Sequence, residues 1–390
     1  MFERTLKPIL LHAASSFRVL LLTGPRQSGK TTLLRTLFPD FQYLSLESPD
    51  RLEQIKSDPR GVLNQATLWL IDEAQTYPEL FSYIQEYVDD PNKNYRFILS
   101  GSQNFLLAEK VSQSLAGRVA ILELLPLSYS EFATHPHLEP LPLWHYLFKG
   151  SYPRPYQEKI DTYLWYESYL RTYLERDVRQ LINVKDLSKF QLFLRLCAGR
   201  HGQLINLNSM SNDCGVSQTT LTQWLSILEQ SYVLFRLQPY FKNFNKRLVK
   251  TPKLYFYDTA LVCHLLNIDS AEHLSLHSAR GAIFEGFVIT ETIKHFLNQG
   301  KRAPVFFWRD HAGLELDLLI ELGNSLTAIE IKSSETYTSE LLKGLKKWIQ
   351  IASNAHIKSA LIYAGADSMT TEKINIVPWQ KTDDYLLKGK

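Results

Sequence analysis

Residues 24–31 read Gly24-Pro25-Arg26-Gln27-Ser28-Gly29-Lys30-Thr31 and match the pattern GxxxxGK(S/T) in full. An apolar run, Val19–Thr23, precedes this segment, and a stretch with helical character, from about Lys30 to Leu37, follows it. A glycine-rich turn between a strand and a helix is the context in which this pattern binds phosphate groups. The segment therefore predicts a phosphate-binding loop at the carboxyl end of a strand.

The residue types of this loop suit a nucleoside triphosphate with a magnesium ion. Glycines let the backbone turn tightly and aim its N–H groups at phosphate oxygens, and the following helix adds the positive end of its dipole. Lys30 would reach the β- and γ-phosphates, and the Thr31 hydroxyl would bind Mg²⁺. We expect ATP and Mg²⁺ as cofactors, bound by Gly24, Pro25, Arg26, Gln27, Ser28, Gly29, Lys30, Thr31 and Thr32.

An acidic motif follows at Leu68–Asp72 and Glu73, where an apolar run ends in two carboxylates. This is the Walker B arrangement, in which Asp72 would hold Mg²⁺ and Glu73 would orient and deprotonate the attacking water. Lys30 and Glu73 are therefore the main catalytic candidates. Taken by itself, the same stretch also fits a buried strand that ends in acids.

Two further catalytic candidates come after this motif. The run Phe97–Ser100 leads into a polar turn, so Ser100, Ser102 or Asn104 could contact the γ-phosphate or the attacking water. The sequence does not choose between them, and Asn104 is kept among the catalytic candidates. Arg118 precedes the next apolar run and could supply charge to the transition state, in its own chain or in a neighbouring subunit. A surface ion pair is the competing interpretation of Arg118.

Five apolar runs alternate with helical stretches over the first 135 residues. The runs are Val19–Thr23, Tyr43–Leu46, Leu68–Asp72, Phe97–Ser100 and Val119–Leu124. This rhythm predicts an α/β domain, with a parallel sheet and helices on both faces. The pattern changes to a polar stretch with several prolines at Pro126–Leu143, so we expect an ATP-binding domain over residues 1–135.

The region 136–250 has mainly helical character. Helices are expected from Ile160 to about Leu181 and at Phe190–Gly199. A helix–turn–helix with a following strand is expected from Leu207–Cys214, Gly215-Val216, Ser217–Gln230 and Val233–Leu237. Ser217 is a suitable N-cap for the second of these helices. Together these elements predict a winged-helix module.

A basic segment overlaps the end of this region. Residues 236–253 hold six basic side chains and no acid, namely Arg236, Lys242, Lys246, Arg247, Lys250 and Lys253. Beside a helix–turn–helix, such a segment could meet DNA phosphates while the second helix enters a groove. Winged helices also serve as protein-interaction modules, so DNA and a protein partner both stay open.

The region 251–390 changes rhythm again. A helix is expected around Phe284–Leu297, followed by strands and one more helix. The expected elements are strands at Pro304–Arg309, Leu314–Leu322 and Ser325–Lys332, a helix at Ser339–Ala352 and a strand at Ser359–Tyr363.

Three carboxylates and a lysine form a second candidate site in this region. Glu330 and Lys332 are two residues apart on one expected strand and therefore share a face, where Asp317 of the preceding hairpin strand can meet them. Glu285 would join them from the helix. Glu285, Asp317 and Glu330 could bind Mg²⁺ for phosphodiester cleavage, with Lys332 positioning the nucleophile. The alternative is an inactive scaffold in which the same residues form an ion-pair network.

The motifs together resemble a known group. Over nearly its whole length, the chain resembles prokaryotic AAA-type P-loop ATPases with a C-terminal PD-(D/E)xK nuclease-like domain of unassigned function. The segments that carry the resemblance are Gly150-Ser-Tyr-Pro153, Thr172-Tyr-Leu-Glu-Arg-Asp-Val178, Lys253-Leu-Tyr-Phe-Tyr-Asp258, Phe284-Glu285 and Glu330-Ile-Lys332. The resemblance implies an intact Asp–Glu pair at the ATP site. One departure is that Leu316, rather than proline, precedes Asp317.

Composition sets the broad class of the protein. The 390 residues are 45% apolar and 21% charged, which is ordinary for a globular chain and excludes a disordered one. A net charge of +3 excludes a uniformly basic nucleic-acid coat. The three cysteines, Cys197, Cys214 and Cys263, have no zinc-site spacing and indicate a reducing compartment. Since no apolar run is long enough to span a bilayer, we expect a cytoplasmic protein without a membrane partner.

Three functions remain open on the sequence. The leading one is an ATP-hydrolysing AAA-type protein that couples its nucleotide state to binding of DNA or a partner. The second is an ATP-regulated, metal-dependent nuclease. The third is a nucleotide switch that recruits a protein partner, and an oligomer is compatible with each of them.

Overall fold

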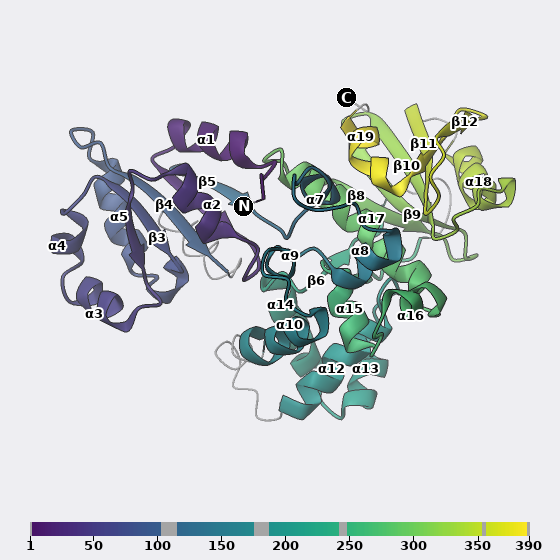
Figure 1. Cartoon of the computed structure of the whole chain (residues 1–390), viewed down its shortest axis with the longest axis horizontal. Coiled ribbons are helices and arrows are strands. Elements are labelled where there is room, and N and C mark those ends of the chain that lie inside the picture. Colours follow the sequence, from purple (N-terminus) through teal and green to yellow (C-terminus); the bar gives the residue numbers. More distant parts are fainter. Residues whose placement is uncertain (1, 103–114, 175–186, 242–247, 353–355, 388–390) are drawn as a thin grey trace.

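The computed structural model describes residues 2–102, 115–174, 187–241, 248–352 and 356–387 (Figure 1). Five parallel strands form the N-terminal sheet in the order β2-β3-β4-β1-β5. The strands are β1 (Val19–Thr23), β2 (Gln42–Ser45), β3 (Leu68–Asp72), β4 (Arg96–Gly101) and β5 (Val119–Glu123). The expected parallel sheet is confirmed, and β4 lies between the strand of the phosphate loop and the Walker B strand.

Helices cover both faces of this sheet because successive side chains of β1 point to opposite sides. Leu20 and Leu22 belong to the core under α1 (Lys7–Ser16) and α2 (Lys30–Leu37). Val19 and Leu21 belong to the core on the other face. That face is covered by α3 (Pro49–Ser57), α4 (Pro59–Leu63) and α5 (Leu80–Asp89).

The middle of the chain is helical, as expected. Its first helices are α7 (Tyr129–Ala133), α8 (Leu143–Lys149), α9 (Arg154–Gln157) and α10 (Thr162–Tyr169), which continues as η2 (Leu170–Leu174). The next are α12 (Leu187–Gly199), α13 (Leu207–Cys214) and α14 (Gln218–Gln230). Gly215 between α13 and α14 has a φ of 61°, and the Ser217 hydroxyl caps α14 by accepting from the Thr220 N–H at 3.1 Å. The expected helix–turn–helix is therefore present.

A two-stranded hairpin follows α14. It pairs β6 (Leu234–Leu237) with β7 (Lys253–Phe256) in antiparallel register. The sequence analysis did not predict strand β7, whose apolar run is short. Because β7 pairs back onto β6, the hairpin crosses the division expected between residues 250 and 251.

The C-terminal part is built on a mixed six-stranded sheet in the order β12-β13-β11-β10-β9-β8. Its strands are β8 (Val305–Arg309), β9 (Glu315–Leu322), β10 (Ser325–Lys332), β11 (His356–Tyr363), β12 (Met369–Thr371) and β13 (Ile374–Pro378). Its helices are α15 (Thr259–Leu265), α16 (Ala271–Leu276), α17 (Arg280–Leu297), α18 (Lys343–Ile351) and α19 (Thr382–Leu387).

Two bodies are visible in Figure 1, with the N-terminal sheet on the left and the middle and C-terminal elements together on the right. One apolar core runs through the right-hand body, from Tyr146 of α8 through Leu221 of α14 to Ile329 of β10. Helix α17 is buried along most of its length and lies within this core. The chain is α/β overall, and its middle and C-terminal parts pack as one unit.

One expected helix has a different form in the structure. The sequence predicts a single helix from Ile160 to about Leu181, but α10 ends at Tyr169 and the chain continues as a π-helical turn to Leu174. Residues 175–181 of the expected helix lie outside the described residues.

Candidate functional site

The phosphate loop has the backbone that its glycines predict. A Cβ atom on Gly24 would lie 2.1 Å from the carbonyl oxygen of Leu124, so only glycine fits there. Gly29 has a φ of 94° and starts α2 at Lys30. The Lys30 ammonium is buried and donates to the carbonyls of Gly24 and Pro25, both at 2.8 Å.

Asp72 of the Walker B strand lies directly against this loop. The Thr31 hydroxyl donates to its Oδ2 at 2.9 Å, and the Tyr43 hydroxyl donates to the same oxygen at 3.0 Å. Ser100, at the end of β4, donates to its Oδ1. The expected pair of Mg²⁺ ligands, Thr31 and Asp72, is therefore in direct contact. The pKa of Tyr43 is raised to about 12, first by burial and then by the Asp72 charge.

Glu73 stands beside Asp72 in an unusual backbone conformation. Its φ of 54° lies in the left-handed region, which non-glycine residues adopt rarely and most often at functional sites. Its carboxylate accepts from the Ser102 hydroxyl at 3.2 Å and from the side-chain amide of Gln75. Burial raises the pKa of Glu73, while the charges of Lys30 and Arg26 oppose the rise. Such a carboxylate is a stronger base than an exposed one.

The loop opens onto a cavity of about 350 Å³, which is within the range of small-ligand sites. One wall comes from the loop residues Arg26 to Thr32 and from Glu73. The opposite wall comes from α9 and its neighbours, through Pro153, Arg154, Gln157 and Glu158. Sequence analysis did not assign these residues to the site, although the segment Gly150–Pro153 was noted for its resemblance.

A second contribution that sequence analysis missed is Arg4. Its guanidinium is buried and donates to the Ser28 carbonyl of the loop at 2.8 Å and to the Leu125 carbonyl at 2.6 Å. It also pairs with the buried Glu131 at 3.1 Å. Arg4 thus fixes the loop to the segment that leaves β5. No motif signals this role, because it depends on contacts between distant parts of the chain.

Two catalytic candidates do not join this site. Arg118 precedes β5, whose first residue pairs with Val19 at the amino end of β1, so Arg118 lies at the edge of the sheet opposite the phosphate loop. There it forms an exposed ion pair with Asp89, and its Nη2 lies 2.9 Å from the carboxylate. The competing interpretation, a surface ion pair, describes its contacts in this chain. Asn104 lies outside the described residues.

The site has the donors that Mg²⁺ and a triphosphate require. Mg²⁺ prefers oxygen ligands, and the Thr31 hydroxyl and Asp72 carboxylate supply them at hydrogen-bonding distance of each other. Lys30 and Arg26 supply positive charge to the wall of the cavity. The residues present therefore fit Mg·ATP.

The second candidate site assembles in part: among the described residues, Glu315 and not the predicted Glu330 joins Glu285 and Asp317 in the group of carboxylates close enough to share a metal ion. Carboxylate oxygens of Glu285, Glu315 and Asp317 all lie within 4.8 Å of one another. Glu315 was missed, although it is two residues before Asp317 on β9 and so shares its face. The expected contact across the hairpin is confirmed, since Lys332 Nζ lies 3.2 Å from Asp317 and 2.7 Å from Glu330.

Lysines occupy the space between these acids. Lys253 of β7 is buried and pairs with Glu285 at 2.9 Å and with Glu315. Burial raises the pKa of both Glu285 and Glu330 to about 7, and the Asp317 charge adds to each rise. For Lys253, the neighbouring carboxylates outweigh burial and raise its pKa above the ordinary value. Each of these four acids thus pairs with at least one lysine.

Three stretches of the chain match models of known families. Residues 16–133 match an AAA domain, whereas residues 142–272 and 280–382 match two domains of unknown function, DUF8612 and DUF4143. An uncharacterized protein of Mycobacterium tuberculosis is 32% identical over 352 residues, which cover 89% of this chain and 76% of the relative. The chain belongs to the same family.

A further relative is similar to the chain at lower identity. An uncharacterized protein of Haemophilus influenzae is 22% identical over 287 residues, which cover 65% of this chain and 70% of the relative. Among solved structures, the Walker-type ATPase PABY2304 of Pyrococcus abyssi matches 68% of this chain and 96% of its own. That match has 16% identity and a TM-score of 0.48. The AAA match and the parallel sheet assign the N-terminal part to the P-loop ATPase fold.

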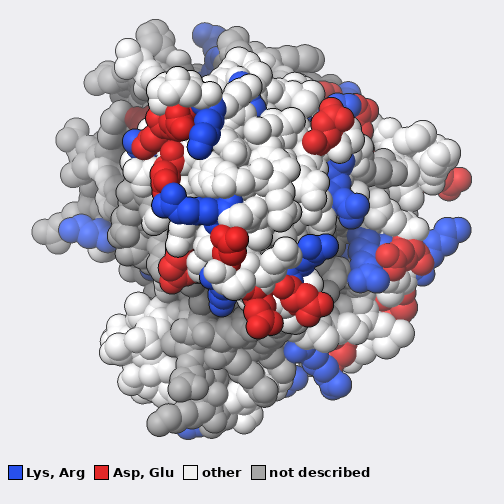
Figure 2. Space-filling view, turned by 90° about the vertical axis from the view of Figure 1, so that its left-hand side faces the viewer, with Lys and Arg blue, Asp and Glu red and all other residues white. Residues whose placement is uncertain are grey.

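Most basic residues of the segment 236–253 either form ion pairs or lie outside the described residues. Arg236 forms a two-fold ion pair with Glu229, at 2.6 and 2.7 Å. Lys253 is buried in the carboxylate cluster. Lys242, Lys246 and Arg247 lie outside the described residues, and Lys250 is exposed. Figure 2, which faces the outer end of the N-terminal sheet, shows acidic and basic side chains interspersed among the described residues of that face.

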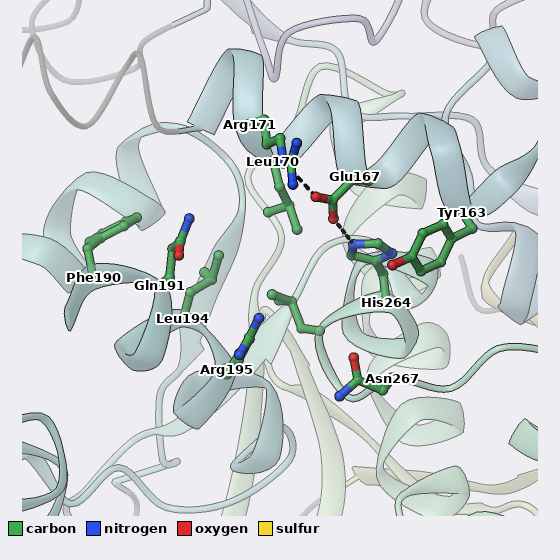
Figure 3. Close-up of a pocket in the computed structure, with 11 residues that line it drawn as sticks. Tyr163, Glu167, Leu170, Arg171, Phe190, Gln191, Leu194, Arg195, His264 and Asn267 are labelled. Carbon is green, nitrogen blue, oxygen red and sulfur yellow. Dashed lines mark hydrogen bonds and ion pairs between the residues drawn. The ribbon is translucent and has the colours of Figure 1, made fainter. Parts of the chain in front are cut away.

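A further cavity, of about 200 Å³, lies between α10, α12 and α15 (Figure 3). Its charged residues are partly paired, because Glu167 binds Arg171 at 2.7 Å and the His264 Nε2 at 3.1 Å. None of the residues that the sequence predicts to be functional lines this cavity.

In the described part of the chain, we find no helix with both the length and the apolar character needed to cross a bilayer.

Proposed function

We propose that this chain binds Mg·ATP in its N-terminal domain and hydrolyses it. The observation that carries the proposal is the contact of Thr31 with Asp72, with Glu73 held beside them at the edge of the cavity. Phosphoryl transfer depends chiefly on positioning and on stabilising charge. The site supplies both through the loop backbone, Lys30 and the two acids.

Each residue then has a defined part in hydrolysis. Lys30 would contact the β- and γ-phosphates, and Thr31 and Asp72 would hold Mg²⁺, which would neutralise charge on the phosphate oxygens. Glu73 accepts a proton from the attacking water, aided by its raised pKa. Ser102 and Gln75 orient the Glu73 carboxylate.

The test compares the wild-type chain with Glu73→Gln. The variant keeps the shape of the side chain but cannot accept a proton, so we expect unchanged ATP binding and a fall in kcat of about 10²- to 10⁴-fold. Binding is measured by calorimetry and hydrolysis by phosphate release. Normal turnover by the variant would contradict the assignment of Glu73 as base.

We further propose that the nucleotide state is coupled to binding of DNA or a protein partner through the winged-helix region. The helix–turn–helix of α13 and α14, followed by the β6–β7 hairpin, supports this assignment. ATP hydrolysis measured with and without DNA, over a range of salt, tests the DNA arm. A nucleotide-dependent pull-down tests the partner arm, and light scattering with each nucleotide tests for an oligomer. The three free, buried cysteines favour a reducing compartment, so we propose the cytoplasm.

A metal-dependent nuclease is the second candidate function, and the assembly of Glu285, Asp317, Glu330 and Lys332 favours it. The Oε2 atom of Glu330 is buried and has no hydrogen-bond partner among the described residues. Such an oxygen is suited to a cation. For cleavage, the carboxylates would hold Mg²⁺ or Mn²⁺ and Lys332 would orient the nucleophile.

The nuclease is tested by incubating the full chain with Mg²⁺ or Mn²⁺ and with DNA and RNA of several forms. Asp317→Ala should abolish any cleavage, since Asp317 contacts both Lys332 and the other acids. Cleavage that survives this substitution would point to a contaminant. Absence of cleavage by the wild-type chain would leave the cluster as a structural ion-pair network.

A further inference from the structure

The outer wall of the nucleotide cavity is a helix of four residues, α9 (Arg154–Gln157), with Glu158 directly after it. So short a helix is not stable by itself and must be held in place by its surroundings. It follows the turn Gly150–Pro153, which leaves α8. What fixes this turn therefore decides where Arg154 stands relative to the phosphate loop.

The turn is held by Asp258, a residue about a hundred positions further along the chain. Its carboxylate accepts from the Ser151 N–H at 2.7 Å and from the Ser151 hydroxyl at 2.9 Å. It also accepts from the Tyr166 hydroxyl at 2.7 Å and from the Leu261 N–H at 3.0 Å. Asp258 is only 2% exposed. A buried carboxylate with four donors joins the turn, α10 and the start of α15 at one point.

Gly150 adds a steric condition to this contact. Its φ is 77°, and a Cβ atom there would lie 2.2 Å from the Tyr166 hydroxyl and 2.8 Å from an Asp258 oxygen. The Tyr156 hydroxyl of α9 donates back to the Gly150 carbonyl at 2.6 Å. The turn and α9 are thus fixed together. The segments Gly150–Pro153 and Lys253–Asp258, distant in sequence, meet here.

We infer that Asp258 is a positioning residue for the nucleotide site: it sets the Gly150–Pro153 turn so that Arg154 of α9 contacts the phosphates of a nucleotide bound to the loop. This inference rests on the proposed ATP site. In the structure, Arg154 pairs with Glu158 at 3.0 Å, and both side chains are about half exposed. An exposed pair of this kind is weak, whereas a guanidinium binds phosphate strongly and in two-fold geometry.

The arrangement also links the nucleotide to the rest of the chain. Asp258 is the N-cap of α15, which packs against α8 and α17 in the shared core. A shift of α9 toward a bound phosphate therefore pulls on the start of α15.

The test measures Kd and KM for ATP, with kcat, in the full chain and five variants: Arg154→Ala, Asp258→Asn, their double variant, Ser151→Ala, and Ser151→Ala combined with Arg154→Ala. Loss of one charge-assisted contact should weaken ATP binding by about tenfold in Arg154→Ala. Asp258→Asn places an amide donor against donors, so it should raise Kd and KM by a similar factor with a smaller change in kcat. The double variant should bind no more weakly than Arg154→Ala, because both changes remove the same contact.

Arg171→Ala is the matched control, since Arg171 forms a similar exposed pair with Glu167 away from the nucleotide cavity. Its ATP affinity should equal that of the wild type. If Asp258→Asn does not fold, Ser151→Ala carries the test, because it removes one bond to Asp258 and keeps the backbone bond. It should weaken ATP binding in the wild-type background but not in the Arg154→Ala background.

Two results would overturn the inference while leaving the ATP site intact. One is an Arg154→Ala variant with wild-type Kd for ATP. The other is effects of Asp258→Asn, or of Ser151→Ala, that multiply with that of Arg154→Ala. A wild-type chain that binds no ATP would instead overturn the proposed function, and this inference with it.

Discussion

The two acid-and-lysine sites of this chain use similar residues in opposite ways. At the phosphate loop, Lys30 donates to the carbonyls of Gly24 and Pro25, and Asp72 accepts from the hydroxyls of Thr31, Tyr43 and Ser100. In the C-terminal cluster, Lys253 and Lys332 pair directly with the carboxylates. The first site opens onto a cavity of about 350 Å³, and the second is filled by its own lysines.

A site that is ready for a ligand therefore differs from a self-paired site in the partners of its charged side chains. Hydroxyl groups hold the Asp72 carboxylate in position, and Lys30 and Arg26 place positive charge at the wall of the cavity, where a phosphate would bind. Paired charges in the C-terminal cluster neutralise each other, and a divalent ion has to compete with an ammonium group there. Four substitutions test this contrast between the two sites.

The largest effect is expected from Lys30→Ala. The ammonium would make charge-assisted contacts to two phosphates, each worth about 1.5–3 kcal/mol, so ATP affinity should fall by about 10³-fold. Calorimetric titration with ATP in the presence of Mg²⁺ measures the loss. Lys7→Ala, an exposed change on neighbouring α1, is the control and should bind ATP normally. Unchanged binding by Lys30→Ala would remove the contrast, since the open site would then not be a nucleotide site.

The next effect is expected from Lys253→Met. Removal of this buried ammonium takes away the cation shared by Glu285 and Glu315, which keep the Tyr255 hydroxyl and Arg309 as their remaining partners. Breaking a buried pair costs about 3–5 kcal/mol of unfolding free energy. Denaturant unfolding in the presence of a chelator measures the loss.

Addition of Mn²⁺ then distinguishes the two interpretations of the cluster. If the acids form a metal site, Mn²⁺ should restore much of the stability of Lys253→Met, because binding to the folded state alone stabilises it. No recovery would indicate a purely structural network. Lys346→Met, which breaks the exposed pair with Glu372 in the same unit, should change stability little in either condition.

A smaller effect is expected in the pH dependence of stability. Burial raises the pKa of Glu330 to about 7 from an ordinary value of 4.5, so the folded chain holds this proton more tightly than the unfolded chain. The stabilisation is complete below pH 4.5 and is lost as the pH rises to about 7. Relative to Glu330→Gln, the wild type should lose roughly 2–3 kcal/mol over this interval in the presence of a chelator. If the difference in unfolding free energy between the two proteins does not change with pH, the result would contradict the raised pKa of Glu330.

The smallest effect is expected from Arg118→Ala. Arg118 forms an exposed pair with Asp89 at the far edge of the sheet, so the melting temperature and the ATP hydrolysis of a dilute chain should not change. Hydrolysis measured against protein concentration extends the test. A loss that grows with concentration would support a role for Arg118 in the site of a neighbouring subunit.

Much of the fold follows from patterns that act over short distances in the sequence. The alternation of apolar runs with helical stretches over residues 1–135 predicts a parallel sheet with helices on both faces, and Ser217 predicts the start of α14. The hairpin strand β7 was missed because its apolar run is short and its partner β6 lies across a long segment. The change from α-helix to π-helix after Tyr169 was not predicted, because periodicity does not reveal where a helix changes its winding.

The sites show the same division. Lys30, Thr31, Asp72 and Glu73 could be assigned because their roles depend on a local motif. The roles of Arg4, Glu315 and the wall formed by α9 depend on contacts between segments far apart in the chain. A sequence without its fold carries no direct record of such contacts. The inferred role of Asp258 as a positioning residue follows only from the fold, which brings its four hydrogen-bond donors together.

The continuous core described above has a mechanical consequence. Because α8, α14 and β10 share one apolar interior with α17, the middle and C-terminal parts cannot slide or separate without exposing it. A C-terminal fragment that begins at β7 would lack the middle helices that cover the apolar flank of α17. Such a fragment should aggregate when expressed alone. The middle and C-terminal parts would therefore move as one body, and any change in domain arrangement would have to take place between that body and the N-terminal sheet.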